Sequence, residues 1–152
     1  GKIDKLILNQ AIENFKIKNY EKSLDVKDFD ISFAKGLSLE DGCATITNFT
    51  AYLISEGIRF IYNSNSIDYK KILVCGGGRK NFYLMKTIRE YSKDYKDLKI
   101  ESIDIFGLDG DYIESQAFGF LAIRSYLGLP ISFPNTTRCK KPTLGGVLVQ
   151  NF

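Results

Sequence analysis

Histidine is absent from the 152 residues of this chain. Nucleophilic catalysis by a serine–histidine or cysteine–histidine pair is therefore excluded, because both arrangements need an imidazole as the base. Cysteine is scarce, and the three thiols at Cys43, Cys75 and Cys139 are irregularly spaced. This spacing fits neither a disulfide framework nor a zinc site, so the sequence predicts a protein of the reducing cytoplasm.

Long apolar runs and charge of a single sign are also missing. No apolar stretch reaches the roughly 18 residues that a membrane-spanning helix needs. The 21 basic and 18 acidic residues are scattered along the chain and give a net charge of +3, which predicts no nucleic-acid or membrane partner. With 44% apolar and 13% aromatic residues, the chain predicts one globular domain with a sizeable core.

The most informative feature that is present is a triple glycine at residues 76–78. It follows an apolar run at 71–75 and precedes a helical pattern that starts at Asn81. Glycine lets another molecule approach the backbone, and the free N–H groups of a helix start favour an anion or a nucleotide. The spacing matches neither the dinucleotide nor the P-loop pattern. A turn that merely lets a strand pack tightly on its helix is therefore an equally good interpretation.

The spacing of apolar residues predicts alternating helices and strands. A capping box at Ser38 and Asp41 marks one helix start, and Asp111 is the expected N-cap of another. The order of the elements predicts an α/β layer fold that contains a β-α-β unit. The expected helices run from Leu6 to about Lys18, from Ser38 to about Ser55, from Asn81 to about Tyr91 and from Asp111 to about Gly128; the expected strands cover 71–75, 98–103 and 142–149, and a linker or loop-rich segment covers 19–35.

Carboxylates mark no metal site and no acid/base pair. The run Asp109-Gly110-Asp111 is similar to part of a calcium loop, but the twelve-residue ligand pattern and its terminal glutamate are missing. We expect a turn that leads into the helix cap. The sequence therefore predicts no metal ligand in this chain.

Four blocks stand out along the chain: Cys75-Gly-Gly-Gly78 followed by Asn81 and Leu84-Met85, Asp111-Tyr-Ile-Glu-Ser-Gln-Ala-Phe-Gly-Phe-Leu-Ala-Ile-Arg124, Gly128-Leu-Pro130 and Leu144-Gly-Gly146. In this order they resemble the C-terminal half of the anhydro-N-acetylmuramic acid kinases. A match upstream, at residues 37–41 and 44–47, extends the resemblance to the helix before the glycines. Residues 22–23 and 29 are similar to remnants of the family's Pro-Lys-Ser-Thr-Gly-Arg-Glu segment.

The resemblance implies one lobe of the actin-like ATPase (ribonuclease H-like) fold, a mixed sheet with flanking helices. In this superfamily two lobes close on ATP. The family opens the 1,6-anhydro bond of anhydro-N-acetylmuramic acid with water and phosphorylates O6, which gives N-acetylmuramic acid 6-phosphate and ADP during peptidoglycan recycling. The resemblance therefore implies ATP and Mg²⁺ as cofactors, the anhydro sugar as substrate, a homodimer when full length, and the bacterial cytoplasm as the location.

The resemblance also assigns site residues. Asn81 would face the nucleotide, and the alternative is that it only caps its helix. Glu114 would hold the anhydro sugar or the attacking water, but a capping box with Asp111 explains it without a substrate. Arg79 and Lys80 replace the family's Ala-His and are placed to attract a polyphosphate. The residues that match the adenosine motif are Gly76, Gly77, Gly78 and Asn81, and the one that matches the sugar site is Glu114.

The lobe that would carry the glycine-rich phosphate loop and the general-base aspartate is not in this sequence, which opens with Gly1-Lys2 and no methionine. Phosphoryl transfer depends on positioning and charge stabilisation around the γ-phosphate. We therefore expect residues 1–152 to be the C-terminal, nucleotide-binding lobe of a two-lobe kinase, a fragment or split gene product without catalytic residues and inactive alone. The alternatives are a non-catalytic or degraded lobe that acts as a binding module, and a kinase for another anhydro sugar such as levoglucosan.

Overall fold

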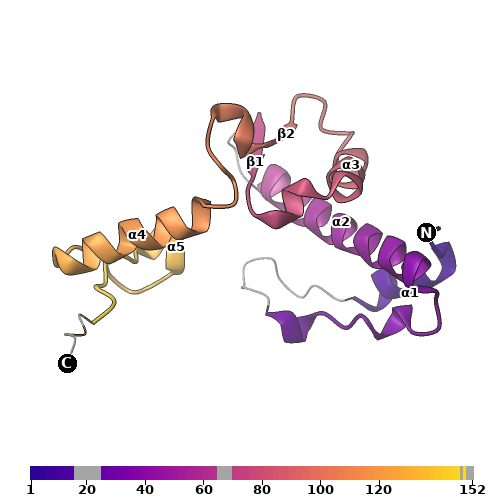
Figure 1. Ribbon diagram of the computed structural model, residues 1–152, viewed down its shortest axis with the longest axis horizontal. Helices are drawn as coiled ribbons and strands as arrows, with labels where there is room; N and C mark the ends of the chain where they lie inside the picture. The colour runs from indigo at the N-terminus through magenta and orange to yellow at the C-terminus, as the bar shows by residue number, and fades with distance from the viewer. Residues whose placement is uncertain (16–24, 65–69, 148, 150–152) are drawn as a thin grey trace. The chain divides into compact units, whose positions relative to one another are not determined.

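A computed structural model describes residues 1–15, 25–64, 70–147 and 149 (Figure 1). The chain divides into two compact units, Gly1–Ser102 and Ile103–Phe152. Unit 1 contains α1 (Lys5–Asn14), η1 (Val26–Asp28), η2 (Ser32–Ala34), α2 (Leu39–Ser64), β1 (Lys71–Val74), η3 (Gly77–Lys80), α3 (Phe82–Tyr91) and β2 (Lys99–Ser102). Unit 2 contains η4 (Ile103–Phe106), α4 (Ile113–Tyr126) and α5 (Pro134–Thr137).

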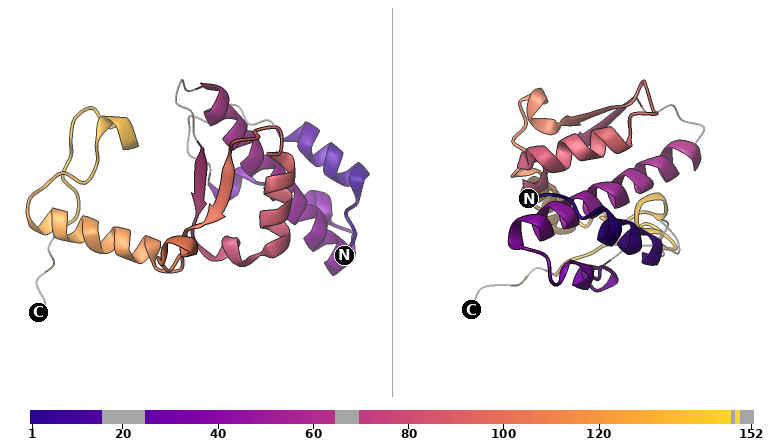
Figure 2. Two further views of the ribbon diagram at one scale, coloured as in Figure 1. Left: turned by 90° about the horizontal axis from the view of Figure 1, so that it is seen from above. Right: turned by 90° about the vertical axis from the view of Figure 1, so that its right-hand side faces the viewer.

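The predicted β-α-β unit is confirmed. Strands β1 and β2 pair in parallel, with Lys71 opposite Lys99 and Val74 opposite Ser102, and α3 forms the crossover between them (Figure 2). The two strands lie side by side and end at the same edge. In parallel α/β sheets ligands bind beyond the carboxyl ends of the strands. The glycine turn follows β1 at that edge.

Helices α2 and α3 and the sheet share one apolar core. Alternate residues of a strand point to opposite faces, so Ile72 and Val74 pack on this core while Leu73 is 44% exposed on the other face. On that outer face the ammonium group of Lys71 lies 3.4 Å from the carboxylate of Glu101. The buried members of the core are Ala51, Ile58, Met85, Ile88 and Ile100.

Replacing Ile88 with alanine tests this core. The Ile88 side chain is 3% exposed, and truncation of a buried isoleucine leaves a cavity that typically costs about 2–5 kcal/mol. We expect Ile88→Ala to lower the free energy of unfolding by that amount, measured by urea denaturation. Ile105→Ala, at a side chain that is 59% exposed, is the control and should change it by less. Equal losses in the two variants would contradict the core assignment.

A second cluster joins α1 to the first half of α2. Leu8 and Ala11 pack against Phe49, and the Phe49 ring makes edge contacts with Phe15 and Phe33 at centroid distances of 5.4 and 5.0 Å. The carboxylate of Asp4 caps α1 by accepting from the Ile7 amide at 3.0 Å. Helix α1 ends at Asn14, before the predicted end, and residues 16–18 of that prediction lie outside the described residues.

Helix α2 begins as predicted but runs further. The Ser38 hydroxyl accepts from the Asp41 amide at 3.1 Å, which confirms one half of the capping box. The reciprocal half is wrong, because the Asp41 carboxylate accepts from the Lys2 amide at 2.6 Å instead. The helix passes the predicted end at Ser55 and reaches Ser64, since Ile58 continues its buried stripe into the core. Of the predicted linker, residues 25–35 hold η1 and η2, and residues 19–24 lie outside the described ranges.

In unit 2 the turn at residues 109–111 is confirmed, but the cap predicted at Asp111 is wrong. The Asp109 carboxylate accepts from the Asp111 amide at 2.9 Å, and the Asp109 carbonyl accepts from the Tyr112 amide at 3.1 Å. This local bonding competes with helix formation, and α4 therefore begins at Ile113 with Tyr112 at the N-cap position.

The strand predicted at 142–149 is also wrong. Among the described residues of that range, Thr143 alone pairs, in an isolated antiparallel bridge with Ser132. A strand is stabilised by side-chain pairs with a neighbouring strand, whereas Leu144 and Val147 are 60% and 89% exposed. The apolar side chains of α4 are not buried either: Phe118 is 65% and Tyr126 75% exposed. No helix within the described ranges is both long and apolar enough to cross a bilayer.

Candidate functional site

The glycine turn is built on one left-handed residue. Gly76 is separated from β1 by Cys75 alone and has φ 80° and ψ 173°. A residue with a side chain adopts this conformation only at an energetic cost. The Gly76 carbonyl oxygen accepts from the Arg79 backbone amide at 3.3 Å and from the Arg79 guanidinium at 3.0 Å. The Asn81 amide donates to the Gly78 carbonyl at 3.0 Å. These bonds fold residues 76–81 into one tight turn between β1 and α3.

The next two glycines have no such backbone reason. Neither has a left-handed φ, and a Cβ built on Gly77 would meet no heavy atom of the described residues within 4 Å. A Cβ on Gly78 would lie 3.7 Å from Leu84 Cδ2, an ordinary contact. Both glycines are exposed. Packing of strand on helix therefore does not require glycine at positions 77 and 78, where the bare backbone is open to the close approach of another molecule.

Asn81 caps α3, which confirms the helix-cap role predicted for it as the alternative to nucleotide binding. Its side-chain oxygen accepts from the Leu84 amide at 3.0 Å, and its extended backbone at φ −79° and ψ 95° is typical of an N-cap. The side chain is exposed at the end of the turn. The cap role and a ligand role are compatible, because the cap uses the amide oxygen alone.

Substitution of Asn81 separates these roles. Loss of an N-cap costs roughly 0.5–2 kcal/mol, and serine is as good a cap as asparagine. We expect Asn81→Ala to lower the free energy of unfolding by about 1 kcal/mol and Asn81→Ser to leave it nearly unchanged, measured by urea denaturation. Loss of stability in the serine variant would contradict the cap.

Positive charge surrounds the turn. Arg79 is half-buried and Lys80 exposed, and both belong to η3 between the glycines and α3. The first turn of α3, all of it described, contains no acidic side chain. The N-terminus of a helix carries a partial positive charge that favours anions. The electrostatics of the turn therefore suit a negatively charged ligand.

Glu114 lies in the first turn of α4 and is exposed. Because the N-cap position is Tyr112, Glu114 does not occupy the N3 position of a capping box with Asp111. The structure therefore excludes this capping box, while a carboxylate in the first turn still stabilises the helix through its dipole, and the role of Glu114 at a sugar site stays a prediction. The residues Gly76, Gly77, Gly78 and Asn81 share one turn of unit 1, whereas Glu114 belongs to unit 2.

Comparison with known proteins identifies relatives of this chain. The family model of anhydro-N-acetylmuramic acid kinase matches residues 11–151. The chain belongs to the anhydro-N-acetylmuramic acid kinase family. It is 53% identical to the anhydro-N-acetylmuramic acid kinase of Pelagibacter ubique, over 100% of this chain and 40% of that protein. It is 38% identical to the kinase of Rhizobium rhizogenes, over 99% of this chain and 38% of the relative.

The chain thus spans about two fifths of the length of its anhydro-N-acetylmuramic acid kinase relatives. The kinase of Zymomonas mobilis, 41% identical, is matched over 82% of this chain and 32% of its own length. All three relatives are named as kinases of the same sugar.

Magnesium, which the resemblance to anhydro-N-acetylmuramic acid kinases implies, stays a prediction. Among the described residues there is no group of three or more carboxylate or thiol side chains that could hold a metal ion. Mg²⁺ prefers a near-octahedral shell of oxygen ligands and usually binds through one or two carboxylates and substrate phosphates. A nucleotide fits better, because the turn offers bare backbone and positive charge together.

Proposed function

We propose that this chain is the C-terminal, nucleotide-binding lobe of a two-lobe kinase with the actin-like ATPase fold. The whole enzyme hydrolyses the 1,6-anhydro bond of anhydro-N-acetylmuramic acid and phosphorylates O6, which gives N-acetylmuramic acid 6-phosphate and ADP in peptidoglycan recycling in the bacterial cytoplasm. The observation that carries the proposal is the exposed, bare backbone at Gly77 and Gly78, which follows a parallel strand in a chain of this family.

ATP is the proposed ligand of the turn, and it supplies the phosphoryl group that is transferred. Gly77 and Gly78 let the nucleotide approach the backbone without a Cβ in its path. Arg79 and Lys80 attract the polyphosphate, while Arg79 also holds the turn by donating to the Gly76 carbonyl. Asn81 caps α3 and so keeps the positive end of that helix directed at the turn.

Glu114 is proposed to serve the sugar. An exposed carboxylate that does not belong to a capping box is suited to accept hydrogen bonds from sugar hydroxyls or to orient the attacking water. Its charge also makes it unsuited to contact the phosphates of ATP. We therefore assign nucleotide binding to the turn of unit 1 and sugar binding to Glu114.

The rest of the machinery is assigned to the part of the enzyme that this chain does not span. Phosphoryl transfer needs a general base and positive charge around the γ-phosphate, and the relatives are more than twice as long as the matched region. We propose that an N-terminal lobe contributes the base and the Mg²⁺ ligands, that the full-length enzyme is a homodimer, and that residues 1–152 alone do not turn over.

A coupled assay of ADP release by the whole protein tests this function. We expect turnover with anhydro-N-acetylmuramic acid and a background rate without a sugar. Faster turnover with levoglucosan would assign another anhydro sugar as the substrate. ATP binding without turnover on either sugar would instead favour a non-catalytic lobe that acts as a binding module.

A further inference from the structure

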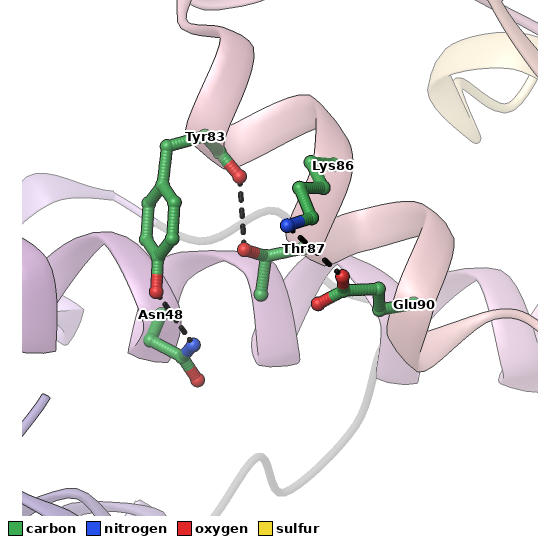
Figure 3. A network of polar contacts seen from close by, with 5 residues as sticks. All are labelled: Asn48, Tyr83, Lys86, Thr87 and Glu90. Carbon is green, nitrogen blue, oxygen red and sulfur yellow. Dashed lines mark hydrogen bonds and ion pairs between the residues drawn. The ribbon is translucent and has the colours of Figure 1, made fainter.

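A buried asparagine joins α2 to both ends of α3. Asn48 lies in the first half of α2 and is 6% exposed. Its side-chain oxygen accepts from the Tyr91 hydroxyl at 2.6 Å, and its side-chain nitrogen donates to the Tyr83 hydroxyl at 3.4 Å (Figure 3). Burying an amide is costly unless it is hydrogen-bonded. Asn48 therefore makes directional contacts in a place where an apolar side chain would pack at lower cost.

The two tyrosines stand at opposite ends of α3. Tyr83 belongs to the first turn of the helix, two residues after Asn81, and Tyr91 is the last helical residue. The other contacts of Figure 3 lie within α3: the Thr87 hydroxyl donates to the Tyr83 carbonyl at 2.8 Å, and Lys86 pairs with Glu90 at 3.7 Å. Those contacts stabilise the helix itself. Of the contacts drawn in Figure 3, the hydrogen bond between Asn48 and Tyr83 is the one that joins α3 to α2.

Apolar packing alone does not fix the register of α3. Ala51, Met85 and Ile88 form the interface between the two helices, and apolar contacts are non-directional. A hydrogen-bonded amide specifies both the rotation and the axial position of the helix, because its donor and acceptor must each meet a hydroxyl. Burial raises the pKa of the Tyr91 hydroxyl, with smaller contributions from its neighbours Tyr83, Tyr52 and Glu90.

We propose that Asn48 is a positioning residue for the nucleotide turn. Through Tyr83 it fixes the first turn of α3, to which Asn81 is bonded twice: its side chain accepts from the Leu84 amide and its carbonyl from the Met85 amide, both at 3.0 Å. Asn81 in turn donates to the Gly78 carbonyl. The hydrogen bond of Asn48 to Tyr83 and those of Asn81 to Leu84, Met85 and Gly78 are thus connected through the covalent backbone of residues 83–85. The proposal rests on the nucleotide site proposed above.

The chain offers a matched control for a purely structural role. Ser55 lies two helical turns after Asn48 on the same face of α2 and is also 6% exposed. Its single hydroxyl proton is shared between the Ala51 carbonyl of α2, at 2.8 Å, and the Ile88 carbonyl of α3, at 3.4 Å. Ser55 is therefore a buried polar tie between the same two helices, but it meets α3 away from the turn. Loss of either tie should lower stability, whereas only loss of Asn48 should disturb the turn.

The test compares Asn48→Leu with Ser55→Ala in the whole protein. Calorimetry with Mg-ATP should give a dissociation constant about tenfold larger than wild type for Asn48→Leu and changed less than twofold for Ser55→Ala. Both variants should unfold at a lower urea concentration than wild type. Tyr83→Phe, which removes the hydroxyl next to the turn, should weaken ATP binding in the same direction. Because the two residues act through one contact, adding Tyr83→Phe to Asn48→Leu should cause little further loss.

The proposal would be overturned if folded Asn48→Leu bound ATP as tightly as wild type, or if Ser55→Ala weakened ATP binding as much as Asn48→Leu. Should Asn48→Leu fail to fold, Tyr83→Phe decides, because Tyr83 is 38% exposed and its loss spares the core. Should the wild-type protein bind no ATP, the proposed function fails, but the positioning role is still decided. The backbone amide resonances of residues 76–81 should then differ from wild type in Asn48→Leu and not in Ser55→Ala; unchanged resonances would refute the role.

Discussion

Gly77→Asp is expected to weaken ATP binding by the whole protein at least 100-fold, which corresponds to about 2.7 kcal/mol. The substitution places a carboxylate on the backbone where the phosphates are proposed to approach, and opposed like charges cost several kcal/mol. The same substitution should leave the free energy of unfolding within about 0.5 kcal/mol of wild type, because a Cβ at this position meets no described atom within 4 Å. Calorimetry and urea denaturation measure the two effects.

Two further variants separate shape from charge. Gly77→Ala adds a methyl group without charge and should weaken ATP binding less than aspartate does. Thr50→Asp adds the same charge at an exposed position of α2 and should leave the ATP affinity within twofold of wild type. If folded Gly77→Asp bound ATP normally, the glycines would have no role in nucleotide binding.

Glu114→Gln is expected to lower kcat/KM for anhydro-N-acetylmuramic acid on the order of 100-fold, which is about 2.7 kcal/mol of lost transition-state stabilisation. The amide keeps the size of the side chain but loses the charge and half of the acceptors. The dissociation constant of ATP should stay within twofold, because Glu114 is assigned to the sugar. Steady-state ADP release and calorimetry on one preparation measure both.

Glu90→Gln is the matched control for this second prediction. Glu90 is exposed on α3 and pairs with Lys86 at 3.7 Å, and an exposed pair of this kind contributes at most about 0.5 kcal/mol. The kcat/KM of the Glu90→Gln enzyme should stay near that of wild type. A Glu114→Gln enzyme with normal kcat/KM would show that the sugar is held elsewhere.

The elements that the sequence predicted correctly are those with local signals. Glycines end the apolar run at residues 71–75, and Asn81 caps the helix that follows, so β1, the turn and α3 can be predicted from neighbouring residues. The start of α2 at Ser38 is a similar case. Where two local solutions compete, the prediction failed: Asp109 bonds the amide of Asp111, and α4 starts later than expected.

Features that depend on distant residues were not predictable. The segment at 142–149 has the composition of a strand, but pairing needs a neighbouring strand that the composition cannot supply, and one bridge forms at Thr143. The role of Asn48 was not predictable for a related reason. A single asparagine in an amphipathic helix is indistinguishable from a surface residue until Tyr83 and Tyr91, 35 and 43 residues away, are brought against it.

In the candidate site, the sequence indicated the glycines but not the reason for each. The left-handed backbone at Gly76 and the absence of one at Gly77 are visible in the structure alone. The guanidinium contact from Arg79 to the Gly76 carbonyl was likewise unforeseen, because the charge of Arg79 pointed to a phosphate rather than to the turn itself.

Hydrogen–deuterium exchange of the whole protein, with and without saturating Mg-ATP, tests the central claim most directly. The account predicts slower exchange in the peptide that covers residues 76–81 and the start of α3, and loss of this protection in Gly77→Asp at the same ATP concentration. ATP bound by the wild-type protein with unchanged exchange at residues 76–81 would contradict the account and place the nucleotide elsewhere.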